Sequence, residues 1–253
     1  MGNKPKDILI VGSGLAGTTL AIELQKRGVR VQLIDNQMEN SSSRVAAGII
    51  NPIVPKGVKK TWQFDEIFPH VFSYYRALEA KFQTSFIQEY PMLQIHANNN
   101  EKHEWRKSAE NADMLHLLSA EGENTIVHLC GRLDVPTFLN TCKLHFEKTQ
   151  QFRSEPFHHQ ELVIHENQTL EYRKKTFDAI VFCEGIGIKQ NPWFHELFFD
   201  PTAGDILTVK IPHLDNHRII KQKQWIVPTQ ESDVFLLGST FHKQSTSYVP
   251  NPE

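Results

Sequence analysis

The sequence predicts an α/β protein in which a domain with a parallel sheet is interleaved with a second, α+β domain built on a mainly antiparallel sheet. A short apolar strand, a glycine-rich turn, a helix and a second strand follow one another within the first 35 residues. After residue 160 the chain changes to a run of short strands separated by turns. With 253 residues, it is long enough for two domains of ordinary size.

The beginning of the chain has the alternation of a βαβ unit. We expect strands at 7–11 and 29–34, because short β-branched runs next to glycine or aspartate are typical of buried parallel strands. A helix is predicted at 15–27, where Lys-Arg before a glycine suits a helix C-terminus. Residues 40–44 are polar and are expected to form a connection.

Later elements follow from apolar periodicity and turn residues. Apolar side chains spaced by three, four and seven predict a helix at 65–82. A polar stretch predicts a helix at 101–112, and apolar residues after Pro136 in a first turn predict another at 134–146. Proline is tolerated only in a first turn, which fits Pro69 if the first of these helices begins near Asp65. Strands are expected at 91–96, 161–165, 170–172, 178–182, 204–211, 225–228 and 234–238.

The composition excludes several classes of protein. There are 27 Lys and Arg against 29 Asp and Glu, so the net charge of −2 gives no basic footprint for nucleic acid, and no nucleic-acid partner is expected. Three scattered cysteines form no disulfide framework or zinc motif, which fits a reducing cytoplasm. No apolar run is long enough for an integral membrane segment, and the histidines lack ligand spacing, so no metal is expected.

A glycine-rich motif follows the first predicted strand and opens the first predicted helix. It has the pattern G-x-G-x-x-G and comprises Gly12, Ser13, Gly14, Leu15, Ala16 and Gly17. The first glycine permits a tight turn, the second lets a pyrophosphate approach the backbone, and the third allows close packing of the helix. The motif therefore predicts a Rossmann-like domain that binds FAD or NAD(P). The alternative is a turn that only joins strand to helix.

An acidic residue ends the second predicted strand. Asp35 lies 23 residues after Gly12, near the offset at which a carboxylate accepts hydrogen bonds from the ribose. It would repel a 2′-phosphate, so NADP is disfavoured, whereas FAD and NAD are not distinguished. We expect Asp35 and its neighbour Asn36 at the ribose; otherwise the aspartate would be a turn residue.

Four blocks carry a resemblance to a known family. In the order and spacing of residues 7–35, 41–52, 131–140 and 178–187, the chain resembles the FAD-dependent oxidoreductases of the D-amino-acid oxidase/glycine oxidase (DAO) family. This resemblance implies that FAD is the cofactor.

The same resemblance implies further cofactor-binding residues. A segment of small residues after the second strand would wrap the pyrophosphate and pass the flavin ring; it contains Ser43, Arg44, Ala46, Ala47, Gly48 and Ile49. The backbone of Gly185 would approach the ADP portion of FAD. The alternative for the segment of small residues is a buried turn, and the alternative for Gly185 is the turn that ends an ordinary strand. Cys183 is interpreted as a core residue.

The resemblance also implies a division of the chain and an activity. A discontinuous FAD-binding domain is expected from 1–58 and 130–200, and a discontinuous substrate domain from 59–129 and 201–253. The expected reaction oxidises the C–N bond of a small amine or amino acid by hydride transfer to flavin. The sequence identifies neither catalytic residues nor an oligomeric state.

Other functions are compatible with the same residues. The block after Ala46 also suits the FAD domain of enzymes that modify the wobble uridine of transfer RNA. Members of the DAO family usually continue beyond the segment Gly238-Ser239-Thr240, so a truncated, non-catalytic FAD-binding protein is another alternative. A plain NAD-dependent dehydrogenase is the third.

Overall fold

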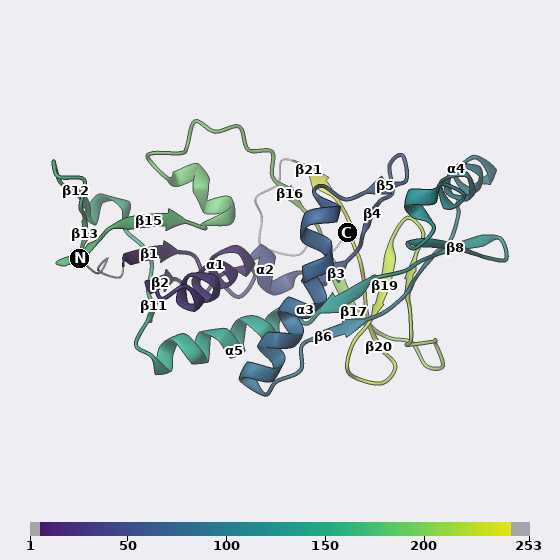
Figure 1. Ribbon diagram of the computed structural model, residues 1–253, viewed down its shortest axis with the longest axis horizontal. Coiled ribbons are helices and arrows are strands. Elements are labelled where there is room, and N and C mark those ends of the chain that lie inside the picture. The colour runs from purple at the N-terminus through teal and green to yellow at the C-terminus, as the bar shows by residue number, and fades with distance from the viewer. Residues whose placement is uncertain (1–5, 244–253) are drawn as a thin grey trace. The chain divides into compact units, whose positions relative to one another are not determined.

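The computed structural model describes residues 6–243, which form two compact units (Figure 1). Of these residues, unit 1 comprises 6–46, 135–202 and 243, and unit 2 comprises 47–134 and 203–242. The elements of unit 1 are β1 (Asp7–Val11), α1 (Leu15–Lys26), β2 (Arg30–Asp35), α2 (Ser42–Val45), α5 (Val135–Lys148), β11 (Phe152–Ser154), β12 (Leu162–Ile164), β13 (Leu170–Tyr172), β14 (Lys175–Phe177) and β15 (Ala179–Phe182), with the 3₁₀ helices η2 (His159–Glu161) and η3 (Gly185–Gln190).

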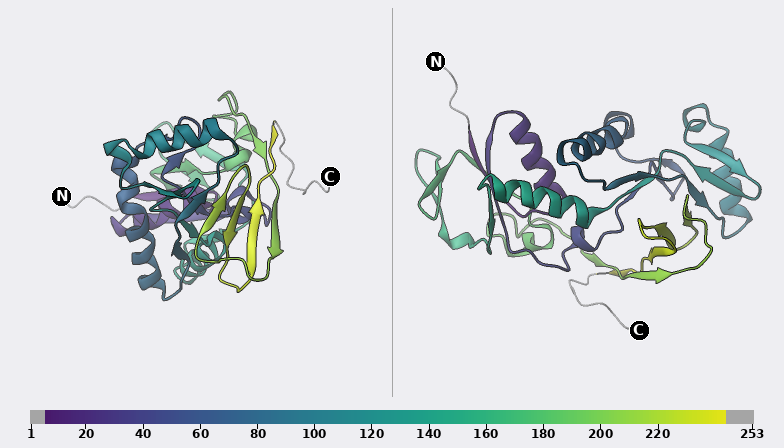
Figure 2. Two further views of the ribbon diagram at one scale, coloured as in Figure 1. Left: turned by 90° about the vertical axis from the view of Figure 1, so that its right-hand side faces the viewer. Right: turned by 90° about the horizontal axis from the view of Figure 1, so that it is seen from below.

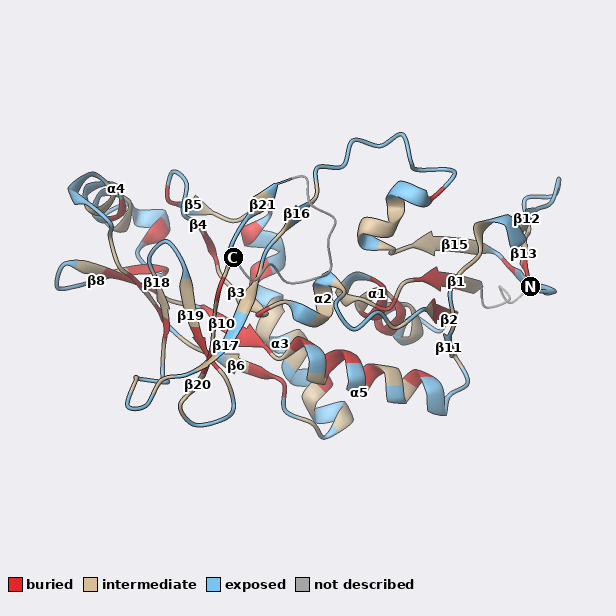
Figure 3. Cartoon of the chain, turned by 180° about the vertical axis from the view of Figure 1, so that it is seen from behind, coloured by how far each residue is buried: buried red, intermediate tan, exposed pale blue. Residues whose placement is uncertain are grey.

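A four-stranded parallel sheet with the order β11-β2-β1-β15 organises unit 1. The central strands β1 and β2 carry runs of aliphatic residues, and most of these are buried (Figure 3). Such runs suit strands that are covered on both faces. The parallel pairs place the carboxyl ends of β1, β2 and β15 along one edge, where Val11 is in register with Ile34 and with Phe182.

The two faces of this sheet are covered by different elements. Helices α1 and α5 pack next to one another, and α1 packs on β1 and β2 (Figure 2). The three-stranded antiparallel sheet β12-β13-β14 contributes Tyr172 and Phe177 to a core with Leu9, Val11 and Ile34. Unit 1 thus has a helical layer, a parallel sheet and a small antiparallel layer.

Unit 2 is built around a seven-stranded sheet with the order β17-β20-β19-β18-β7-β9-β8. Its pairs are antiparallel except for β18 and β7, which run parallel. Its elements are β3 (Ile49–Ile50), β4 (Ile53–Val54), β5 (Lys59–Lys60), α3 (Phe64–Phe82), β6 (Ile87–Glu89), β7 (Met92–Gln94), α4 (Asn99–Ala109), η1 (Ala112–Met114), β8 (Leu118–Glu121), β9 (Asn124–Val127), β10 (Gly131–Leu133), β17 (Ile206–Lys210), β18 (Ile219–Lys221), β19 (Trp225–Pro228) and β20 (Val234–Gly238). Strands β16 (Thr202–Ala203) and β21 (His242–Lys243) lie where the chain passes between the units.

Helices α3 and α4 supply aromatic side chains to the core of unit 2. Phe64 and Phe68 of α3 stack at 4.8 Å between ring centroids, and Trp105 is the buried residue of α4. The predicted apolar stripe of α3 is therefore a core-facing stripe. The helix begins at Phe64, so Pro69 lies in its second turn, inside the helix rather than in the first turn as expected.

The C-terminal turn of α3 is held by a carboxylate. Oε1 of Glu79 accepts hydrogen bonds from the backbone N–H groups of Phe86, at 2.6 Å, and Ile87, at 2.8 Å. Burial would raise the pKa of Glu79, but these two hydrogen bonds and Arg76 outweigh it and hold the pKa below its ordinary value. The ionised carboxylate of Glu79 therefore stabilises the turn between α3 and β6.

The observed architecture confirms the predicted fold class, with a parallel sheet in one unit and a mainly antiparallel sheet in the other. The expected plain connection at 40–44 was wrong, because Ser42–Val45 form the short helix α2, in which the Ser41 carbonyl accepts hydrogen bonds from Arg44 and Val45. The sequence patterns missed twelve of the described strands: β3, β4, β5, β6, β8, β9, β10, β11, β14, β16, β18 and β21. None of the described helices is long and apolar enough to cross a membrane.

Candidate functional site

The turn after β1 is closed by two neighbouring strands. The N–H of Gly12 donates to the Ile34 carbonyl at 2.8 Å, and the Cys183 N–H donates to the Val11 carbonyl at 2.7 Å. Gly12 has a φ of 99°, a left-handed value that favours glycine. A Cβ on Gly12 would lie 2.3 Å from the Cys183 carbonyl oxygen, so a side chain at this position would collide with the end of β15.

The third glycine of the motif sits where α1 crosses this turn. A Cβ on Gly17 would lie 1.9 Å from the Gly12 carbonyl oxygen and 3.2 Å from the Cys183 Cβ. The hydroxyl of Thr18 in turn donates to the Ser13 carbonyl at 2.9 Å. The close crossing of helix and turn that the motif predicts is therefore present in unit 1.

The N-terminus of α1 is open at the second glycine. Gly14 is the N-cap residue and provides no side-chain cap. Within 4 Å, a Cβ on Gly14 would meet only the side chain of Ser43, whose Oγ would lie 2.8 Å away. The same Oγ accepts a hydrogen bond from the Leu15 N–H at 3.1 Å. Since the first N–H groups of a helix have no intrahelical acceptor, this end can bind an anionic group.

The carboxylate of Asp35 fixes the same turn from the end of β2. One oxygen, Oδ2, accepts from the Ser13 N–H at 2.6 Å. The other, Oδ1, accepts from the backbone N–H of Gln37 at 2.5 Å and from its Nε2 at 2.9 Å. Asp35 therefore holds the glycine-rich turn in addition to its predicted contact with ribose, whereas its neighbour Asn36 is exposed.

A polar bridge that the sequence did not reveal extends from this turn. Gln37 has a φ of 58°, and its side chain donates to Ser13 Oγ at 3.1 Å and accepts from Arg44 at 2.8 Å. Arg44 also donates to Oδ1 of Asn140, on α5, at 3.1 Å. Strained residues in a hydrogen-bonded network are frequent at functional sites.

The end of β15 lies beside the first glycine, as the packing of Gly12 on Cys183 shows. Gly185 follows with a φ of 55°, and a Cβ there would meet nothing within 4 Å. Its conformation, rather than crowding, favours glycine at this position. Burial raises the pKa of the Cys183 thiol, and the Glu184 carboxylate raises it further. The thiol is therefore protonated at neutral pH, which does not suit a nucleophile. The expected core position was wrong, because Cys183 follows the end of β15 and is only partly buried.

The predicted cofactor residues divide between the two units. Unit 1 brings together the glycine-rich turn, Asp35, Ser43, Arg44 and Gly185, and Ala46 is the last residue of its first segment. Unit 2 begins with Ala47, which is buried, and continues with Gly48 and Ile49. Gly48 has a φ of 72° and its carbonyl accepts from the Leu133 N–H, while Ile49 pairs with Arg132 in a β-ladder. Of these three predicted residues, Ile49 lies in an edge strand of a unit 2 sheet, and Ala47 and Gly48 precede it.

The geometry of unit 1 fits a dinucleotide. A turn at the carboxyl edge of a parallel sheet, a helix N-terminus whose N-cap residue has no side chain, and a carboxylate at the end of the next strand are the parts of such a site. The open side of Gly14 provides the close backbone approach that a pyrophosphate requires. Among the described residues, no group of three His, Cys, Asp or Glu side chains could hold a metal ion.

Comparison with curated proteins finds similarity over most of the chain. The tRNA 5-methylaminomethyl-2-thiouridine biosynthesis bifunctional protein MnmC of Campylobacter jejuni subsp. doylei is 23% identical over 99% of this chain and 40% of its own length. The D-amino-acid oxidase of Schizosaccharomyces pombe is 24% identical over 89% of this chain and 66% of its own length. The chain therefore spans less than two thirds of either relative.

Solved structures share the fold. Glycine oxidase from Geobacillus kaustophilus aligns with a TM-score of 0.69 and 16% identity, over 97% of this chain and 74% of that protein. L-proline dehydrogenase from P. horikoshii gives the same TM-score with 13% identity, over 98% and 74% of the two chains.

The match to a protein family is nearly complete. The model of the FAD dependent oxidoreductase family, DAO, matches residues 7–253. This span includes the glycine-rich turn, Asp35 and the end of β15, and it confirms FAD rather than NAD as the cofactor. The chain belongs to the DAO family of FAD-dependent oxidoreductases.

Proposed function

We propose that this protein oxidises the C–N bond of a small amino acid or amine. FAD, when bound, supplies the redox chemistry and accepts the hydride that leaves the carbon next to nitrogen. The observation that carries the proposal is the nucleotide site of unit 1, with its glycine-rich turn fixed by Asp35 and by the end of β15. The names of several structural relatives, among them glycine oxidase and L-proline dehydrogenase, support this substrate class.

We assign the ADP portion of FAD to unit 1 and substrate binding to unit 2. The N-terminus of α1, with Ser43 and Arg44 beside it, would hold the pyrophosphate, since both N–H groups and a positive charge favour phosphate oxygens. Asp35 would accept a hydrogen bond from the ribose through the lone pair of Oδ2 that Ser13 does not use, since Gln37 donates twice to Oδ1. Ala47, Gly48 and Ile49 would pass the flavin ring.

The sheet of unit 2 offers a suitable wall for substrate. Successive side chains of a strand point to opposite faces, and Met92, Ile219 and Val227 face the aromatic core. The opposite face carries a row of aliphatic side chains in register across six strands: Leu207, Leu237, Ile226, Ile220, Leu93 and Ile126. Leu207 is 59% exposed. We propose that this aliphatic row contacts the apolar part of the substrate and excludes water from it.

Anaerobic reduction of the flavin tests the proposal. The FAD-loaded protein is mixed with a panel of amino acids and secondary amines, and bleaching of the flavin absorbance is followed. Saturable bleaching by one class of amine is expected. Leu207→Arg should slow it without loss of FAD, whereas Val163→Arg changes an exposed strand residue of unit 1 and should not. Retention of FAD with no bleaching by any amine would contradict the substrate class.

A second candidate substrate is a modified uridine of transfer RNA. The similarity to MnmC, which covers 99% of this chain, favours it. In this alternative the oxidised C–N bond belongs to a nucleotide, so bleaching would require transfer RNA and would not occur with free amines. Adding transfer RNA that carries an aminomethyl uridine to the same anaerobic assay distinguishes the two candidates.

A further inference from the structure

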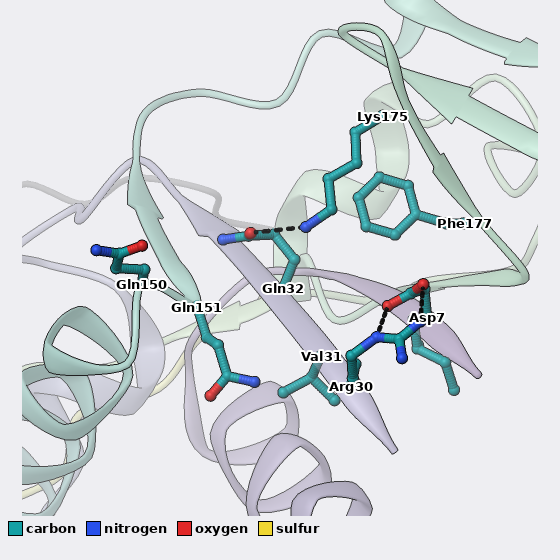
Figure 4. A pocket seen from close by; sticks show the side chains of 9 residues that line it. Asp7, Arg30, Val31, Gln32, Gln150, Gln151, Lys175 and Phe177 are labelled. Carbon is teal, nitrogen blue, oxygen red and sulfur yellow. Dashed lines mark hydrogen bonds and ion pairs between the residues drawn. The ribbon is translucent and has the colours of Figure 1, made fainter. Parts of the chain in front are cut away.

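A second pocket of unit 1 lies at the amino ends of the parallel strands, away from the glycine-rich turn (Figure 4). Its volume is about 290 Å³, and its lining includes Asp7 of β1, Arg30 and Gln32 of β2 and Lys175 of β14. Asp7 and Gly12 are five residues apart along one extended segment, which corresponds to roughly 16 Å. The pocket is therefore separate from the nucleotide site.

The buried side chain of Gln32 in this pocket has an amide nitrogen that is not hydrogen-bonded to any described residue. Gln32 is 5% exposed, and its Oε1 accepts from Lys175 Nζ at 3.3 Å. Its Nε2 is buried and has no hydrogen-bond partner among the described residues. An amide nitrogen carries two donors, and a buried unsatisfied donor is costly, so an acceptor from outside the chain is needed here.

The charges around the amide favour an anion. Arg30 and Asp7 neutralise each other, since Nε of the arginine lies 2.6 Å from Oδ1 and NH2 lies 2.5 Å from Oδ2. Asp178 Oδ2 accepts from the Asp7 backbone N–H and is the other carboxylate nearby. Lys175 is exposed and forms no ion pair in the described part of the chain, so its ammonium group beside the Gln32 amide can pair with an anion.

The pocket also has an apolar wall. Phe177 is buried, and the Lys175 ammonium group lies 5.3 Å from the centre of its ring. Figure 4 shows Gln32 between Lys175 and the turn that carries Gln150. A small molecule with an oxyanion at one end and a carbon skeleton at the other would contact both the donors and the ring.

We propose that this pocket is a second ligand site, which binds a small carboxylate or phosphate through Lys175 Nζ and Gln32 Nε2. The oxyanion would accept a charge-assisted hydrogen bond from the ammonium group and a second hydrogen bond from the amide. The remaining part of the ligand would lie against Phe177. The site does not depend on which amine the enzyme oxidises.

Nuclear magnetic resonance of the Gln32 side-chain amide tests this site directly. The ¹⁵N-labelled protein is kept saturated with FAD so that the N-terminus of α1 is occupied, and sodium phosphate or sodium succinate is added at constant ionic strength against sodium chloride. We expect the Gln32 Nε2 resonance, assigned by its loss in Gln32→Leu, to shift saturably with phosphate, succinate or both. The anion that saturates at lower concentration identifies the chemical source.

Two substitutions of neighbouring lysines complete the test. Lys175→Gln removes the pocket's ammonium group and should weaken anion binding at least about tenfold, or about 1.4 kcal/mol. Lys174→Gln makes the same charge change at an exposed residue that does not line the pocket, so it should bind as the wild type does. A Gln32 resonance that neither anion shifts, which would indicate a pocket filled by water, overturns the proposal. Equal binding by both lysine variants also overturns it.

Discussion

The crossing of α1 over the glycine-rich turn makes Gly17→Ala a sharp test of the site. Alanine in place of a helical glycine normally stabilises a helix by about 1 kcal/mol. Here the new methyl group would lie 1.9 Å from the Gly12 carbonyl oxygen, a backbone atom that cannot rotate away. Overpacking typically costs about 1–3 kcal/mol, and this overlap belongs at the upper end. We therefore expect a net destabilisation of about 2 kcal/mol.

Thermal unfolding and an FAD titration measure the two consequences. A loss of 2 kcal/mol should lower the melting temperature by roughly 4–8 °C in a chain of this size. FAD affinity should fall as well, because the turn that Gly17 supports is displaced. Gly14→Val should instead abolish FAD binding, because the valine side chain would occupy the space that the pyrophosphate needs. The fold should be retained, because a Cβ at this position meets only the movable side chain of Ser43.

A glycine of the same unit provides the control. A Cβ on Gly187 would have its nearest contact at 3.4 Å, from the Glu184 Cβ, so Gly187→Ala should leave both measurements near the wild-type values. If Gly17→Ala has the melting temperature and the FAD affinity of the wild type, a methyl group at residue 17 does not disturb the glycine-rich turn. If Gly14→Val retains wild-type affinity, the pyrophosphate does not approach the backbone at this glycine.

Three further outcomes are expected. Asp35→Ala should weaken FAD binding by about 1–3 kcal/mol in a fluorescence titration, because charged acceptors of the turn are lost; Glu39→Ala, which removes an exposed carboxylate nearby, should not. Leu207→Arg should lower kcat/KM for an amine at least tenfold with FAD affinity unchanged, and an equal loss in Val163→Arg would contradict a role for the aliphatic row. Glu79→Gln should lower the free energy of unfolding at pH 7 by about 1 kcal/mol in urea. The pKa of Glu79 is lowered in the folded protein, so its ionised carboxylate stabilises the fold fully above the ordinary pKa of 4.5. This stabilisation disappears as the pH falls through the folded pKa. If Glu79→Gln lowers the free energy of unfolding as much at pH 3 as at pH 7, the ionised carboxylate is not the cause.

The nucleotide site was predictable because its determinants are local. The motif from Gly12 to Gly17 and Asp35 combine backbone requirements with fixed spacing, and both kinds of information are present in one short segment. The strand at the beginning of the chain and the first helix were predictable for the same reason. The observed bounds differ from the expected ones by a residue at most in these elements.

The parts that the sequence missed depend on distant partners. Strand β10 has three residues, and its pairing with β3 and β6 decides its conformation. The bridge from Gln37 through Arg44 to Asn140 connects residues about a hundred positions apart, and ordinary polar side chains give no periodic signal. The unpaired amide nitrogen of Gln32 was also unpredictable, because the sequence does not show which atoms surround a glutamine in a buried strand.

The order of unit 1 along the chain has a consequence for biosynthesis. Its sheet needs β15, which begins at Ala179, and the turn at Gly12 is completed by the carbonyl of Cys183. The intervening residues 47–134 form unit 2, so a ribosome must release more than 180 residues before the first 20 can form their final contacts. At roughly 5–20 residues per second, this interval lasts about ten seconds or more. During that time the apolar β1 and β2 lack the contacts with β15 that cover one of their edges in the finished unit, and unpaired strand edges are prone to aggregation.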